Sequence, residues 1–270
     1  MTPVDPLRVL VVDDEAPIRD ELAWLLAQDD VIGAAIAAAR AEVDALLWRR
    51  DVRAAAVEVA AASVDRGARD SAAIDGADLA VVEDSPMGRV LDAALRLTEA
   101  VPGQVDVFAR APLQALAHLH ALTAQGFVPA AELGRPRSGD RADDPLGLGG
   151  LPPAAAAADR LALLSRTLTA PTEAPALLLA AIAHAELAVL RPFGWGSGLL
   201  ARAAVRLVVA GRGVDPSLFS IPEHGVLELG RPAYVTALRS YATGTRAGLR
   251  EFVVWHSTAL AMGAQAVVVP

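Results

Sequence analysis

The chain has 270 residues, enough to bury a sizeable core, and its lack of cysteine excludes disulfides, thiolate chemistry and Cys-bound metals. Its net charge of −8 argues against a general nucleic-acid binder, which needs a basic face. All 24 basic residues are arginine and much of the hydrophobic content is alanine, so neither type alone indicates function. Because no apolar run is long enough for a membrane span and no basic region precedes the first apolar run, we expect no secretory signal and a cytoplasmic protein.

The first 30 residues form an N-terminal segment that differs from the rest of the chain. Residues 7–12 read LRVLVV, an apolar run that predicts one short β-strand, and a helix is expected at about 17–27. The stretch LRVLVVDDEAPIRDEL resembles the opening of a response-regulator receiver, in which the acidic pair, here Asp13 and Asp14, binds Mg²⁺. The chain contains no lysine and shows no alternating strand–helix pattern afterwards, so we reject a complete receiver domain.

From residue 31 to residue 270 the pattern is helical, and the predicted fold class is mainly α. Apolar spacing predicts helices within about 32–69 and at 87–99, 112–124, 154–169, 175–190, 199–211, 231–241 and 247–264. Residues 134–153 read GRPRSGDRADDPLGLGGLPP, a composition that predicts an irregular loop or flap. We interpret its acidic residues Asp140, Asp143 and Asp144 as a solvated cluster rather than a metal site.

The most specific feature is a loop between two predicted helices, with the sequence RPFGWGSG. Gly196 and Gly198 flank Ser197 directly before the second helix. The free N–H groups of a helix start, together with the positive end of the helix dipole, attract anions. Arg202 follows one turn into the helix. This arrangement favours binding of a phosphate or another anion.

Residues 191–202 resemble the signature loop of the Fic/Doc family, H-P-F-x-D/E-G-N-G-R-x-x-R. Pro192, Phe193, both glycines and Arg202 match that motif. We extend the resemblance from about residue 31 to the end of the chain, as a Fic-like helical domain with its flap at about 134–153. The resemblance implies binding of ATP and Mg²⁺ and transfer of AMP to a protein. It adds Phe193 to the candidate nucleotide- or anion-binding residues, which are then Phe193, Gly196, Ser197, Gly198 and Arg202.

Four motif positions depart from the family pattern. The motif His, which the resemblance makes the general base, is replaced by Arg191, and arginine stays protonated. The metal-holding acid is replaced by Trp195, the Asn by Ser197 and the first Arg by Leu199. No catalytic residue or metal ligand is therefore assigned. His184, seven residues before Arg191, is interpreted as a packed helical histidine or, alternatively, as a substitute base.

A second, shorter match lies at Ser71, Asp75 and Gly76, in the sequence SAAIDG. It resembles the family's inhibitory motif, S/T-x-x-x-E-G/N, whose Glu pairs with an Arg of the loop and blocks productive nucleotide binding. Asp75 has a shorter reach than Glu, and we expect the Arg that it should meet to be altered as well. The alternative is an ordinary helix end at which Ser71 and Gly76 act as caps.

These observations favour a Fic-like protein with a degenerate loop, which binds a nucleotide or anion or acts as a regulatory interaction module. Its protein partner or target is unidentified, and we expect no nucleic-acid or membrane partner. One alternative is an active AMP transferase that uses a non-standard base such as His184. A further alternative, of another class, is a receiver-type regulator that responds to phosphorylation. The sequence does not indicate an oligomeric state.

Overall fold

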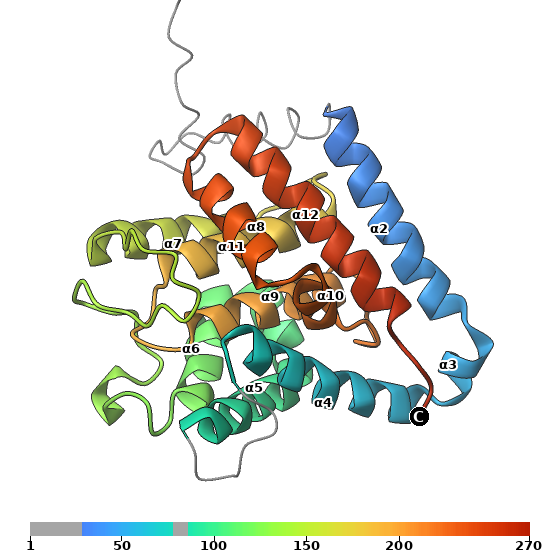
Figure 1. Ribbon diagram of the computed structural model, residues 1–270, viewed down its shortest axis with the longest axis horizontal. Helices are drawn as coiled ribbons and strands as arrows, with labels where there is room; N and C mark the ends of the chain where they lie inside the picture. The colour runs from blue at the N-terminus through green and yellow to red at the C-terminus, as the bar shows by residue number, and fades with distance from the viewer. Residues whose placement is uncertain (1–28, 78–85) are drawn as a thin grey trace, which may run out of the picture.

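The computed structural model describes residues 29–77 and 86–270, which are mainly helical (Figure 1). The helices are α2 (Asp30–Trp48), α3 (Arg50–Ala54), α4 (Ala56–Ile74), α5 (Pro86–Arg110), α6 (Pro112–Thr123), the 3₁₀ turn η1 (Ala130–Glu132), α7 (Ala154–Thr169), α8 (Ala176–Leu190), α9 (Ser197–Gly211), α10 (Pro222–Leu229), α11 (Arg231–Ala242) and α12 (Arg246–Gln265). Over the described ranges, β structure is limited to one isolated bridge between Gln125 and Val128. The predicted mainly helical fold class is confirmed. The predicted strand at 7–12, the helix after it, Asp13 and Asp14 lie outside the described residues.

Helices α8 and α9 form the centre of the molecule. The sequence of α8, ALLLAAIAHAELAVL, is apolar around nearly its whole circumference, and such a helix is stable only when it is enclosed by other elements. Helix α9 is also buried along almost its full length, with Arg202 and Arg206 among its buried side chains. Helix α5 packs against α9, whereas α11 and α12 pack against α8 (Figure 1).

A single capping carboxylate links α2 to α12. The carboxylate of Asp29 accepts the N–H groups of Val31 and Ile32 at the start of α2, and it also pairs with Arg250 of α12. Helices α2 and α12 therefore run side by side (Figure 1). No helix in the described part of the chain has the length and apolar character needed to cross a lipid bilayer.

Helices α10 and α12 cross at two glycines. A Cβ atom on Gly225 would lie 1.7 Å from the carbonyl oxygen of Ala259, and one on Gly263 would lie 2.3 Å from that of Ile221. Both distances are far inside van der Waals contact, so neither position has room for a side chain. This crossing fixes α10 beside the middle of α4, where it supplies Glu223 to the interior.

The structure differs from the sequence-based prediction in one additional helix and in several helix boundaries. The sequence does not predict α10, because eight residues with a central glycine carry a weak helical signal. Helix α5 continues to Arg110 rather than ending at Glu99, and Pro102 lies on its exposed side. Pro102 removes one hydrogen bond from this helix, which packs against α9. Helix α9 begins at Ser197, two residues before the predicted start.

Candidate functional site

The predicted anion-binding loop joins α8 to α9 and comprises residues 191–196. Helix α8 ends at Leu190, and the next residue, Arg191, has a left-handed backbone with φ 43°, a conformation that usually requires glycine. Gly196, with φ 76°, stands directly before Ser197, the first residue of α9. The N–H groups of the first turn of α9 have no carbonyl partners within the helix. The backbone therefore has a helix start directly after a glycine, which is the feature on which the predicted anion site depends.

Aromatic stacking fixes this α8–α9 loop against the body of the protein. Phe193 is buried and stacks on His120 with 4.2 Å between ring centroids, while Trp195 stacks on Phe127 at 3.7 Å. The hydroxyl of Ser197 accepts the N–H of Phe193 at 3.3 Å, so it stabilises the loop itself. Burial lowers the pKa of His120 to about 4, so its ring is neutral at physiological pH.

Arg202 projects from the first turns of α9 and is enclosed by the end of α4. Its Nε donates to the hydroxyl of Ser71 at 2.7 Å, and its Nη2 donates to the Ser71 carbonyl at 3.1 Å. The same Nη2 pairs with Asp75 Oδ2 at 2.9 Å, and the Arg202 side chain is only 2% exposed. The expectation that Asp75 faces an altered arginine is wrong, because the end of α4 reaches Arg202, which the motif match retains.

Ser71 and Asp75 act together because they lie four residues apart on one face at the end of α4. Gly76, with φ 92°, ends that helix and turns the chain away. Burial acts to lower the pKa of Arg202, but Asp75 and Tyr234 outweigh that effect and raise the pKa above its ordinary value. Arg202 is therefore a charged group held inside the protein.

Two polar atoms of this cluster remain without a hydrogen-bond partner: Arg202 Nη1 and Asp75 Oδ1. Both residues lie beside Gly198 in the first turn of α9, since a Cβ atom there would be 3.4 Å from Arg202 Nη1 and from both Asp75 carboxylate oxygens. A buried guanidinium N–H without an acceptor is costly, which makes this position suited to a further oxygen atom.

The flap, residues 134–153, carries neither helix nor strand, and it is tied to the α8–α9 loop by two arginines. Arg191 pairs with Asp144 of the flap at 3.1 Å and also donates to the carbonyl of Gly149. In the opposite direction, Arg137 of the flap donates to the carbonyl of Arg191 at 2.8 Å and to that of Pro152 at 2.6 Å. Arg191 is therefore a structural link to the flap rather than a free cation.

Asp143 of the flap reaches the α8–α9 loop directly, and the sequence gives no signal for this. Its Oδ2 accepts the N–H of Gly196 at 3.1 Å, while its own N–H donates to the carbonyl of Gly194 at 3.0 Å. Burial raises the pKa of Asp143 to about 6; the N–H of Gly196 and Arg191 act against this rise, whereas Asp75 acts in the same direction as burial.

The interpretation of the three flap aspartates as a solvated cluster is therefore wrong for two of them. Asp143 contacts Gly196 and Asp144 pairs with Arg191, because the flap folds back over the loop. Only Asp140, whose side chain is 80% exposed, remains in solvent as expected. Spacing within the flap cannot reveal these contacts, since Asp143 and Gly196 are 53 positions apart.

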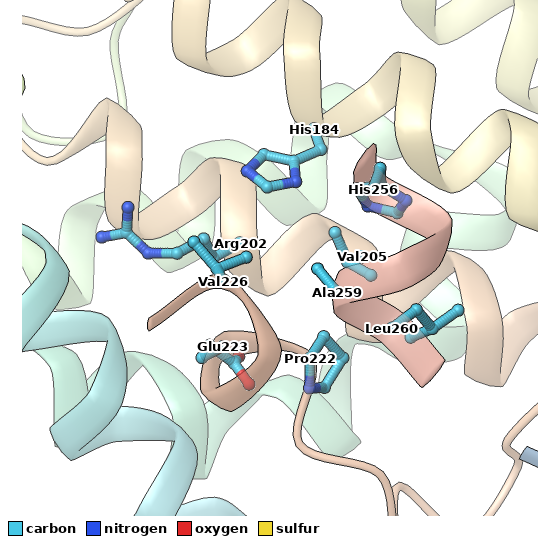
Figure 2. Close-up of a pocket in the computed structure, with 9 residues that line it drawn as sticks. All are labelled: His184, Arg202, Val205, Pro222, Glu223, Val226, His256, Ala259 and Leu260. Atoms are coloured by element: carbon cyan, nitrogen blue, oxygen red, sulfur yellow. The ribbon is translucent and has the colours of Figure 1, made fainter. Parts of the chain in front are cut away.

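His184 lies inside the helical body rather than at the mouth of the loop. It is 1% exposed, and its Nε2 lies 2.7 Å from the hydroxyl of Tyr234. It lines a cavity of about 10 Å³, which accommodates roughly one water molecule. Figure 2 shows its ring beside that of His256, with Pro222 and Glu223 of α10 below them. Burial lowers the pKa of His184 well below its ordinary value, so the ring is neutral and enclosed.

The residues around the loop suit an anion better than a divalent cation. Trp195 offers no oxygen ligand, Asp75 is paired with Arg202, and Asp143 is bound to the loop backbone. Over residues 29–77 and 86–270, no group of three or more His, Asp or Glu side chains is arranged to hold a metal ion. The loop N–H groups and Arg202 are, by contrast, donors that a phosphate requires. The Mg²⁺ that the sequence resemblance implies does not fit these residues.

The sequence matches no model of a known protein family and no curated protein. Its fold, however, matches solved structures. A Fic family protein from Desulfovibrio desulfuricans G20 superposes with a TM-score of 0.68 at 20% sequence identity, covering 86% of this chain and 73% of that one. A fragment of Fic-1 from C. elegans superposes with a TM-score of 0.65 at 16% identity, covering 87% of this chain and 71% of that one. The chain therefore has the fold of Fic proteins, and this likeness concerns the fold alone.

Proposed function

We propose that this Fic-like protein binds a nucleotide or another phosphate-bearing anion at the start of α9, and that it rests in a closed state. The loop N–H groups and the guanidinium of Arg202 supply the donors. In the resting state Ser71 and Asp75 hold Arg202 against α4. The observation that carries this proposal is the enclosed Arg202, which has one carboxylate partner and one unpaired N–H beside the helix start.

Transfer of AMP is not part of the proposed function. Arg191 cannot accept a proton, and its pairing with Asp144 holds it to the flap. Loss of a general base typically slows a reaction by about 10²–10⁴-fold. Leu199 also replaces an arginine that would stabilise developing charge. We therefore propose a binding and regulatory module that acts through a protein partner still to be identified.

Calorimetry with ATP tests the binding site and its closure. In Asp75→Asn a neutral amide replaces the carboxylate that holds Arg202, so we expect ATP to bind about tenfold more tightly than to the wild type. Asp65→Asn is the matched control, because Asp65 is an exposed partner of Arg69 on the same helix. The proposal fails if neither the wild type nor Asp75→Asn binds ATP at millimolar concentration.

The AMP-transferase alternative has a separate test. Incubation of the unmodified protein with labelled ATP and Mg²⁺ should give no labelled protein. Labelling that His184→Ala abolishes would establish the enzyme. The enclosed position of His184 and its contact with Tyr234 argue against that outcome. The receiver-type alternative concerns Asp13 and Asp14, and acetyl phosphate is the reagent that tests it.

A further inference from the structure

We infer that Asp143 acts as an internal competitor, with its carboxylate occupying the place at Gly196 that a ligand anion takes. The inference rests on the proposed function, since it names how the same anion site is regulated. It differs from the closure by Ser71 and Asp75, which hold the Arg202 side chain at the end of α4. Asp143 instead comes from the flap and contacts the loop backbone.

Two hydrogen bonds place the Asp143 carboxylate at this position. The Oδ2 atom accepts the N–H of Gly196 at 3.1 Å, and the Asp143 N–H donates to Gly194 at 3.0 Å, which fixes the backbone of the flap there. A carboxylate oxygen and a phosphate oxygen are both anionic acceptors for a backbone N–H near a helix start. One oxygen must leave before another binds to the same donor.

The unpaired polar atoms beside Gly198 provide an independent indication of a ligand. Arg202 Nη1 is buried and lacks an acceptor, although Arg202 makes several other contacts. Asp143 satisfies the loop donor at Gly196 but leaves this N–H unsatisfied. A phosphate has several oxygens where Asp143 presents one to the loop, so it can satisfy both donors. Asp143 thus satisfies only one of the two donors of the site.

Charge makes occupation by Asp143 and by a ligand mutually exclusive. The charged groups that influence Asp143 are Asp75 at the end of α4, Asp144 in the flap and Arg191 in the loop, and Glu132 of η1 lies near Gly194. Of these charged groups only Arg191 favours the ionised carboxylate, in addition to the N–H of Gly196, and Arg191 is already paired with Asp144. An additional anion within about 4 Å of Asp143 is strongly disfavoured in a partly buried site.

Ligand binding is therefore coupled to movement of the flap. Asp144, the next residue, pairs with Arg191 and accepts the N–H groups of Leu148 and Gly149. Displacement of Asp143 moves this turn as well, so the hydrogen bonds that hold the flap become weaker. Amide hydrogen exchange in residues 138–150 should accordingly become faster when the anion binds, whereas a ligand that merely fits under a closed flap slows it.

The variant Asp143→Asn tests the effect of the negative charge at this position while it keeps the shape of the side chain. Asparagine retains an oxygen that accepts the N–H of Gly196 but carries no charge. We expect Asp143→Asn to bind ATP about tenfold more tightly than the wild type. Asp140→Asn, which removes the same charge from an exposed site in the flap, should bind ATP as the wild type does.

The possible outcomes distinguish this inference from the proposed function. If Asp143→Asn and the wild type bind ATP equally while Asp75→Asn binds more tightly, Asp143 is not a competitor and the anion site stands. If the wild type, Asp75→Asn and Asp143→Asn all fail to bind, both the inference and the proposed function are wrong. Tighter binding by Asp143→Asn but not by Asp140→Asn supports the inference.

The wild type provides a further test that requires no variant. Because the pKa of Asp143 is about 6, its carboxylate loses its charge as the pH falls from 7.5 to 5.5. Sulfate is a suitable probe, because its charge is constant over this range. We expect sulfate to bind about tenfold more tightly at pH 5.5, and expect this gain to be absent from Asp143→Asn. A wild-type affinity that does not change with pH overturns the inference.

Discussion

At the scale of single residues, the ion pair between Arg206 and Glu223 is the most heavily buried charged contact near the site. Arg206 Nε and Nη2 donate to the two oxygens of Glu223 at 2.8 Å, and the remaining guanidinium nitrogen donates to Ser63 at 3.0 Å. The two side chains are 1% and 2% exposed. Such a pair contributes little net stability, but removal of one charge leaves the other unpaired in the interior.

We therefore predict that Glu223→Gln lowers the free energy of unfolding by about 3–5 kcal/mol, as measured by urea denaturation. Glu228→Gln, in the same helix but with its side chain 53% exposed, is the control and should change the stability by less than about 0.5 kcal/mol. The double variant Arg206→Met with Glu223→Leu should lose less than Glu223→Gln, because it buries no unpaired charge. A loss below about 1 kcal/mol in Glu223→Gln would contradict this account.

The residues of the candidate site could be named from the sequence, but their partners could not. The glycines and Arg202 stand at recognisable spacings before and within α9, and Ser71 and Asp75 form a recognisable short pattern. The pairing of Asp75 with Arg202 depends on where α4 ends in space, which local sequence does not encode. The interpretation of Asp143 as a solvated residue is wrong for the same reason, because its contact with Gly196 exists only once the flap has folded over the loop.

At the scale of elements, the crossing of α10 and α12 permits a sharp comparison between two glycines. In Gly225→Ala the new Cβ lies 1.7 Å from a backbone oxygen of α12, so the helices must separate. We predict a loss of about 3 kcal/mol or more in the free energy of unfolding.

Gly33→Ala is the matched control, because Gly33 is exposed in α2 and a Cβ there has no neighbour within 4 Å. This variant should gain about 0.5–1 kcal/mol, since alanine favours a helix over glycine. Both changes are read from the midpoint and slope of urea denaturation. Equal effects of the two substitutions would show that the α10–α12 contact is looser than described.

Elements with a strong apolar pattern were predicted well, and those that depend on distant packing were not. Helix α7 occupies 154–169 as predicted, and α8 begins one residue after its predicted start, because Pro153 and Pro175 mark their starts. Helix α10 forms only because α12 covers Gly225, and α5 passes through Pro102 because neighbouring helices hold it. In both helices the cause is packing against other helices, which the sequence of the helix itself does not reveal.

At the scale of the whole molecule, three buried histidines make the stability depend on pH. Burial lowers the pKa of His120 and His256 to about 4, and it lowers that of His184 well below its ordinary value. In the unfolded chain a histidine has a pKa of about 6.5, so between pH 6.5 and 4 the unfolded state binds protons that the folded state does not. Their contribution to stability is complete above pH 6.5 and is lost as the pH falls towards 4.

Asp143 and Glu186 act in the opposite sense, because burial raises their pKa, so a single histidine must be removed to isolate the effect. We predict that His256→Gln loses stability less steeply between pH 6.5 and 4.5, by up to about 1.4 kcal/mol per pH unit. Urea denaturation at several pH values measures this slope. The exposed His118, replaced by Gln, controls for the removal of one histidine. An unchanged slope in His256→Gln would mean that His256 is already charged in the folded protein.

The proposed closure of the loop by Asp75 and Asp143 has a consequence for any partner that binds the flap. If about one molecule in a hundred is open, a ligand binds about a hundredfold more weakly than its contacts alone allow. A partner that selects the open flap removes this penalty without touching the ligand. By thermodynamic linkage, the ligand strengthens the partner's hold by the same factor. The ligand and the partner would then stabilise each other's complexes without direct contact, because the binding of both depends on the position of Asp143 and its turn.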